Sequence, residues 1–94
     1  MVDRAVHDRP QRSRFELVAD GELIAWADYS LDGDTLVVPH VETAIAHRGH
    51  GNAARLMDGI VEHLRATDRT IRPVCSYAAG YLRDRPDTHD LLAH

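Results

Sequence analysis

The sequence lacks lysine altogether and has a single cysteine and few aromatic residues. All 11 basic residues of the 94-residue chain are arginine, so the protein has no side-chain amine that could itself be modified. The lone cysteine, Cys75, excludes an internal disulfide. No apolar run approaches the roughly 20 residues of a membrane-spanning helix, and residues 1–14 lack the apolar core of a signal peptide. These absences favour a cytoplasmic protein with no membrane partner.

A surplus of positive charge is also missing. The chain has 15 acidic residues against 11 basic ones, which gives a net charge of −4. Proteins that bind nucleic acid generally present a basic surface, so this balance argues against a nucleic-acid partner. The length and the 44% content of hydrophobic residues suit one small globular domain with one core.

Three strand-like segments occupy the first half of the chain. Residues 14–20 alternate apolar and polar side chains, and residues 22–29 form a return strand after the turn signal Asp20-Gly21. Asp32-Gly33 marks a second turn, and residues 35–43 form a third strand. Consecutive strands joined by tight turns predict an antiparallel three-stranded meander.

Helical patterns dominate the second half. Residues 51–66 carry apolar side chains at helical spacing, which predicts one long helix with a single buried face. Residues 71–75 form a short edge strand, which a strand–helix–strand crossover would pair in parallel with the third strand. Ser76 can cap a C-terminal helix over residues 77–84. The fold class is therefore α+β. Residues 1–13 are charged and almost free of apolar side chains, so we expect them to form a flexible N-terminus.

Two glycines lie between the third strand and the long helix. Gly49 and Gly51 immediately precede the helical pattern. The first N–H groups of a helix have no intrahelical partner, and together with the helix dipole they favour an anion. Glycine has no side chain to keep a phosphate away from the backbone. The loop is therefore a candidate phosphate site, with a simple turn as the alternative.

Several side chains near this loop are candidates for chemistry. Cys75 directly precedes the C-terminal helix, whose N-terminus favours a thiolate; the alternative is a small buried apolar residue. His40 and Glu42 point to the same face of their strand, and one of them could act as a general base or both could face solvent. Tyr77 and Tyr81 are one helical turn apart, either in the core or with a hydroxyl in a pocket. The histidine spacing matches no standard zinc pattern, so we expect no metal.

The segment Arg48-Gly49-His50-Gly51-Asn52-Ala53 resembles the Arg/Gln-x-x-Gly-x-Gly/Ala motif of the GNAT acyltransferases. Within that family the chain looks most like the small single-domain GNAT-like proteins of the YjdJ type. Their His-Thr-Glu-Val-like strand is similar to His40-Val41-Glu42-Thr43. Their Cys-Pro-Phe-like start and His-Pro-Glu/Asp-like end are similar to the segment from Cys75 to Tyr81 and to Arg85-Pro86-Asp87. The resemblance covers nearly all of residues 14–92 and implies a single GNAT-like domain over residues 14–94.

The resemblance implies an N-acetyltransferase that uses acetyl-CoA as co-substrate and a sheet with a V-shaped split that holds coenzyme A. Backbone N–H groups of residues 49–53 would bind the diphosphate, and the strand edge at residues 41–43 would pair with pantetheine. The residues implied to bind the co-substrate are Val41, Glu42, Thr43, Arg48, Gly49, His50, Gly51, Asn52 and Ala53.

The resemblance also implies two routes of transfer. Cys75 would accept the acyl group itself, or the amine would attack the thioester directly with Glu42 as base and Tyr81 as acid. The chain departs from the family pattern at Asn52, where isoleucine is common, and at Ser76, where proline is common. We also expect it to lack the additional N-terminal helices that build the acceptor site in full-length GNAT enzymes.

Three functions remain open at this point. The first is a minimal acetyltransferase acting on an unidentified amine of a peptide, a protein or a small molecule, as a monomer or weak dimer. The second is an acyl-CoA-binding or partner-binding module without turnover. The third is an interaction domain in which the glycine loop is only a turn.

Overall fold

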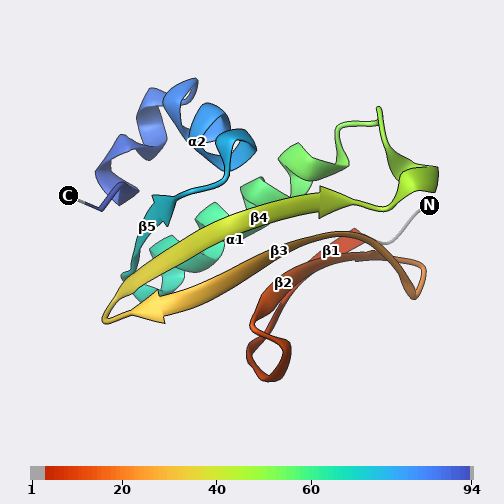
Figure 1. The fold of residues 1–94 in the computed structure, drawn as a ribbon, viewed down its shortest axis with the longest axis horizontal. Helices are drawn as coiled ribbons and strands as arrows, with labels where there is room; N and C mark the ends of the chain where they lie inside the picture. The colour runs from red at the N-terminus through yellow and green to blue at the C-terminus, as the bar shows by residue number, and fades with distance from the viewer. Residues whose placement is uncertain (1–3, 94) are drawn as a thin grey trace.

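The computed structural model describes residues 4–93 and contains one five-stranded sheet (Figure 1). The strands lie in the order in which they occur in the chain: β1 (Arg4–Arg9), β2 (Arg14–Ala19), β3 (Glu22–Asp32), β4 (Thr35–Thr43) and β5 (Thr70–Pro73). The first four pair antiparallel, and β5 pairs in parallel with β4. The predicted meander and parallel edge strand are confirmed, with one more strand than expected.

Two α-helices, α1 (Asn52–Thr67) and α2 (Ser76–Arg83), complete the α+β fold. Figure 1 shows α1 running behind the sheet, and it contacts β1, β2, β3 and β4. Its buried apolar side chains are Leu56, Met57, Ile60 and Leu64. Helix α2 packs against α1, β4 and β5. Three short 3₁₀ segments follow β1, β4 and α2: Pro10–Arg12, Ile45–His47 and Pro86–Leu91. Within residues 4–93, no helix is both long and apolar enough to span a bilayer.

The expected flexible N-terminus is wrong for residues 4–12. Strand β1 pairs with β2 along its whole length, from Arg4 opposite Ala19 to Arg9 opposite Arg14. Helix α1 approaches it closely because Gly59 has no side chain: a Cβ there would lie 2.4 Å from a methyl group of Val6. The backbone pairing with β2 and the close contact with α1 together hold this segment in a defined conformation, although it has few apolar residues. The first three residues of the predicted flexible segment lie outside the described part.

The core lies between α1 and the covered face of the sheet. Phe15, Leu17, Ala25, Ala27 and Leu36 are at most 2% exposed on the strands. Side chains of alternate strand residues point to opposite faces, so Trp26 and Asp28 lie on the face of the sheet that α1 does not cover. We call this the open face.

Strand β5 pairs with only the first half of β4. The register runs from Thr35 opposite Thr70 to Val38 opposite Pro73. The N–H groups of Val74 and Cys75 then both donate to the Val38 carbonyl, each at 3.0 Å. Beyond this point β4 continues to Thr43, and within residues 4–93 β3 is the only strand that pairs with it there. The sheet therefore splits between β4 and β5, as the V-shaped split predicted from the resemblance requires.

Candidate active site

The loop before α1 exposes a row of backbone donors. Gly49 and Gly51 adopt the left-handed conformation, with φ values of +80° and +74°, which glycine adopts without strain. The first helical hydrogen bond is donated by Arg55 to the Gly51 carbonyl at 3.2 Å. Among the described residues, no protein group accepts a hydrogen bond from the N–H groups of residues 49–54. Six consecutive backbone N–H groups thus remain without a partner in the described part of the protein.

Side chains of α1 hold the loop in this shape. Asn52 donates its amide to the His47 carbonyl at 3.0 Å, and Arg55 donates to the His50 carbonyl at 2.7 Å. Arg55 also donates to the Asn52 side-chain oxygen at 3.0 Å. These bonds tie the loop carbonyls to the protein and leave the N–H groups unbonded. Asn52, which departs from the family pattern, is 5% exposed and acts as this brace.

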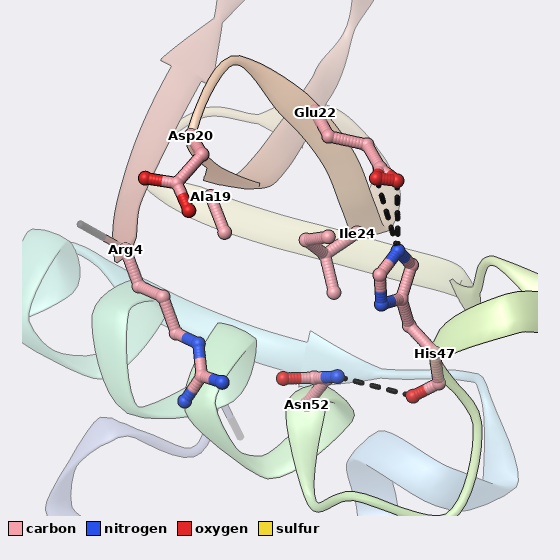
Figure 2. Close-up of a pocket in the computed structure, with 7 residues that line it drawn as sticks. All are labelled: Arg4, Ala19, Asp20, Glu22, Ile24, His47 and Asn52. Atoms are coloured by element: carbon pink, nitrogen blue, oxygen red, sulfur yellow. Dashed lines mark hydrogen bonds and ion pairs between the residues drawn. The ribbon is translucent and has the colours of Figure 1, made fainter. Parts of the chain in front are cut away.

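A second brace lies behind the loop, in the hollow shown in Figure 2. His47 comes within 3.0 Å of the Glu22 carboxylate and so ties the loop to the start of β3. Arg4 and Asn52 line the same hollow, which has a volume of about 290 Å³. Neighbouring parts of the fold thereby fix the loop conformation from both ends.

The split in the sheet opens into a cleft of about 370 Å³. It is lined by His40, Val41, Glu42, Thr43, Arg48, Ala53 and Tyr77. Ala44 donates its N–H to Ile24 of β3. Because peptide groups along a strand point to alternate sides, those of Val41 and Thr43 face the cleft. The Thr43 carbonyl accepts a hydrogen bond from Arg48 Nε at 3.2 Å. The cleft therefore offers an unpaired strand edge next to the free donors of the loop.

Glu42 is the acidic residue of this cleft. Its carboxylate lies 2.8 Å from His40 Nε2 and 3.6 Å from Arg48 Nη2, and the side chain is 39% exposed. The structure thus brings His40 and Glu42 together on one face of β4, as the strand periodicity predicts. A half-exposed carboxylate beside an imidazole can accept a proton from a bound amine.

The other two predicted catalytic residues do not line the cleft. Cys75 is the N-cap residue of α2, partly buried against the core, at the point where β4 and β5 diverge. Tyr81 is buried, and its hydroxyl donates to Asp58 of α1. Burial, and then the hydrogen bond to Asp58, raise the pKa of Tyr81 well above the usual range. A raised pKa weakens a phenol as a proton donor.

Tyr77 is the tyrosine that lines the cleft. Its side chain is 41% exposed, and burial of the rest raises its pKa above the usual value. The signal in the sequence was the pair of tyrosines one helical turn apart. Their shared spacing did not reveal that the packing of α2 on α1 turns the Tyr81 hydroxyl toward Asp58, whereas Tyr77 lines the cleft.

Comparison with protein families agrees with this geometry. Residues 14–91 match the family model of the GCN5-related N-acetyl-transferases. The chain belongs to this family. Membership of the GNAT family makes it an acetyltransferase domain, whereas the narrower likeness to the YjdJ type remains a prediction.

A solved GNAT structure shows the same fold. The NMR solution structure of a GCN5-like protein from Staphylococcus aureus aligns with a TM-score of 0.66 at 19% identity, over 95% of this chain and 87% of that chain. No curated protein matches the chain.

Proposed function

We propose that this GNAT domain transfers an acetyl group from acetyl-CoA to an amine acceptor. The observation that supports this most strongly is the run of unbonded N–H groups at residues 49–54, next to the unpaired edge of β4. A diphosphate needs several converging donors, and a helix N-terminus supplies them together with a favourable dipole. An amide-containing pantetheine arm can pair with a free strand edge as an additional strand does.

The unpaired edge and the loop would hold different parts of the co-substrate. The diphosphate would lie on the N–H groups of residues 49–53, with the Arg48 guanidinium beside it. The pantetheine amides would pair with the peptide groups of Val41 and Thr43. The thioester would then reach the point where β4 and β5 diverge, close to Cys75.

In direct transfer, the amine nitrogen attacks the thioester carbonyl carbon. A carbon–nitrogen bond forms, the carbon–sulfur bond breaks, and Glu42 accepts the proton that the nitrogen loses. The coenzyme A thiolate then takes a proton from a phenol. Tyr81 is the acid that the family resemblance implies, and Tyr77 is the tyrosine that the cleft exposes.

In the covalent route, the Cys75 sulfur attacks the thioester carbon and coenzyme A leaves as its thiol. The amine nitrogen then attacks the acetyl carbon, the carbon–sulfur bond to Cys75 breaks, and the Cys75 thiolate takes up the proton that the nitrogen loses. Cys75 supports this route by its place at the divergence of the two strands and at the N-terminus of α2. Intact-mass measurement after incubation with acetyl-CoA decides between the routes. The covalent route predicts one acetyl adduct on the wild type and none on Cys75→Ser.

Binding of acetyl-CoA is tested by thermal unfolding and calorimetric titration. A ligand that binds only the native state stabilises it by about 2.7 kcal/mol at a concentration of 100 times its Kd. Gly51→Ala is expected to weaken binding at least about tenfold, because its methyl group stands among the donors of the loop. Gly33→Ala is the matched control, since Gly33 also has a positive φ and open space but lies in a distant turn. Equal binding by both variants would contradict the diphosphate site.

A binding module without turnover is the second candidate. The observation that favours it is the Tyr81 hydroxyl, which is engaged by Asp58 and whose pKa is raised. Release of the coenzyme A thiol in the presence of amines separates the two functions. Acetyl-CoA binding without thiol release over a broad panel of amines and peptides would support the binding module.

A further inference from the structure

Four side chains form a compact block on the open face of the sheet. Trp26 and Asp28 of β3 lie directly opposite Glu42 and His40 of β4, respectively. Directly opposed residues of antiparallel strands have Cβ atoms about 5 Å apart. The intervening Ala27 is fully buried on the α1 side, so the block faces away from α1. We call these four residues the acceptor block.

The acceptor block combines groups that attract an ammonium ion. The indole ring of Trp26 has an electron-rich face that attracts cations. The Arg14 guanidinium lies 5.8 Å from the centroid of that ring. Asp28 lies directly opposite Arg14 of β2, but among the described residues no ion pair joins them or holds Asp28 elsewhere. Glu42, the proposed base, completes the set.

An arginine cluster lies beside the acceptor block on the neighbouring strands. Arg9, Arg12 and Arg14 surround the carboxylate of Glu16, at 3.2, 3.2 and 2.6 Å. Glu16 is directly opposite Trp26 and is 3% exposed. One carboxylate faces three guanidinium groups, so the cluster keeps an excess of positive charge. The side chains of Arg9 and Arg12 are 36% and 58% exposed to solvent.

The position of Glu42 dictates where an acceptor must lie. A general base has to come within hydrogen-bond reach of the proton that it removes. Because Glu42 points to the open face, the amine has to approach over that face and bind next to the other residues of the acceptor block. Strands are about 4.8 Å apart, so Glu42 on β4 is about 10 Å from the position of Glu16 on β2, around which the arginines gather.

We propose that the acceptor is a dipolar molecule that carries an amine and an anionic group about 10 Å apart. The amine lies beside Glu42 on β4, the anionic group contacts the arginine cluster around Glu16 on β2, and Trp26 of β3 lies beneath the chain that joins them. A peptide or small amine with a distant carboxylate fits this description, whereas a polyamine does not. This inference rests on the proposed function, because it takes Glu42 as the base.

Trp26 makes the test direct, because it is the only tryptophan of the chain. Its fluorescence therefore reports on the acceptor block alone. We would titrate the full chain with 8-aminooctanoate, whose extended form matches the required separation of charges, and with octylamine and octanoate as controls. The dipolar probe is expected to bind about five-fold more tightly than either control, the upper range for one exposed charge contact.

Substitutions test which residues contact the amine end of the probe and which contact its carboxylate end. Asp28→Asn is expected to weaken 8-aminooctanoate and octylamine by about two- to five-fold and to leave octanoate unchanged. Arg12→Gln is expected to weaken 8-aminooctanoate and octanoate and to leave octylamine unchanged. Asp32→Asn, a carboxylate further along β3 that pairs with Arg72, is the matched control and should alter none of the three.

Equal binding of the three probes, or no binding of the dipolar probe by calorimetry at millimolar concentration, would overturn the proposal. Acetyl-CoA binding and coenzyme A thiol release are measured on the same samples. If the protein binds acetyl-CoA and releases the coenzyme A thiol equally fast with amines that carry a carboxylate and amines that do not, the dipolar acceptor is refuted. The proposed function then still stands. Loss of acetyl-CoA binding itself refutes the proposed function.

Discussion

The two halves of strand β4 differ in their neighbours. Residues 35–37 pair with β3 on one side, residues 35–38 pair with β5 on the other, and Leu36 and Val38 are fully buried. Within residues 4–93, residues 40–43 pair with β3 alone, and residues 39–43 are at least partly exposed. The pairing with β5 ends where the N–H groups of Val74 and Cys75 both donate to the Val38 carbonyl. One strand thus contributes a stable core in its first half and an available binding edge in its second half.

The largest effect on stability is expected for a substitution in the paired half of β4. Leu36→Ala removes a fully buried side chain and should lower the free energy of unfolding by about 2–5 kcal/mol. Val41→Ala, in the unpaired half, should cost clearly less, because Val41 is only partly buried. Urea denaturation of both variants measures the difference. Similar losses would show that the two halves are equally important for stability.

A close contact between α1 and β1 gives the next effect. In Gly59→Ala the new methyl group meets Val6 at 2.4 Å, and such overpacking costs about 1–3 kcal/mol, reduced by the better helix propensity of alanine. Gly80→Ala, in α2, meets only a flexible Arg83 side chain at 3.5 Å and should be neutral or stabilising. Thermal unfolding compares the two variants. Acetyl-CoA affinity should not change in either, since both positions are outside the cleft.

A second substitution at Val6 tests whether the clash causes the loss of stability in Gly59→Ala. If the methyl group clashes with the Cβ and methyl groups of Val6, the double variant Val6→Gly/Gly59→Ala should be more stable than the sum of its single changes predicts. Simple additivity would mean that β1 does not pack on α1 as described.

The arginine cluster predicts a dependence of stability on pH. Burial raises the pKa of Glu16, but hydrogen bonds from Arg14, Arg9 and Arg12 outweigh it and hold the pKa below the usual value. The unfolded chain then binds the proton more readily than the native one, so stability is fully present above the unfolded pKa and is lost as pH falls through the lower native pKa. Glu16→Gln should therefore show a shallower loss of stability below about pH 4.5 than the wild type. Parallel curves from denaturant titrations at several pH values would contradict this assignment.

The elements with regular patterns were predictable from the sequence. Alternation and the Asp-Gly turns located β2, β3 and β4, and helical spacing located α1, because each signal is local. Strand β1 was missed because Ala5 and Val6 are the only apolar residues of its segment. What stabilises it is contact with Gly59, far away in sequence, which no local pattern reveals.

The candidate site was predictable where it depends on the backbone. The free donors follow from glycines at a helix start, and the contact of His40 with Glu42 follows from strand alternation. The difference between Tyr77 and Tyr81 depends on how α2 packs on α1. The acceptor block depends on the register between β3 and β4. Both are tertiary features, so the sequence alone could not place them.

The smallest effect on stability, and the sharpest test of the unpaired half, is expected for Arg48→Gln. The Arg48 side chain is 58% exposed, and its contacts with Glu42 and the Thr43 carbonyl should contribute less than about 1 kcal/mol to stability. In the free protein Arg48 donates a hydrogen bond to the Thr43 carbonyl, which the pantetheine amide would otherwise use. A bound diphosphate would attract the guanidinium and so release that carbonyl. Loss of the guanidinium should therefore weaken acetyl-CoA several-fold and strengthen S-acetylpantetheine, which has no phosphate. Calorimetric titration with both ligands measures these opposite changes. If the affinities for acetyl-CoA and for S-acetylpantetheine both decrease, Arg48 stabilises the cleft and does not compete with pantetheine for the Thr43 carbonyl.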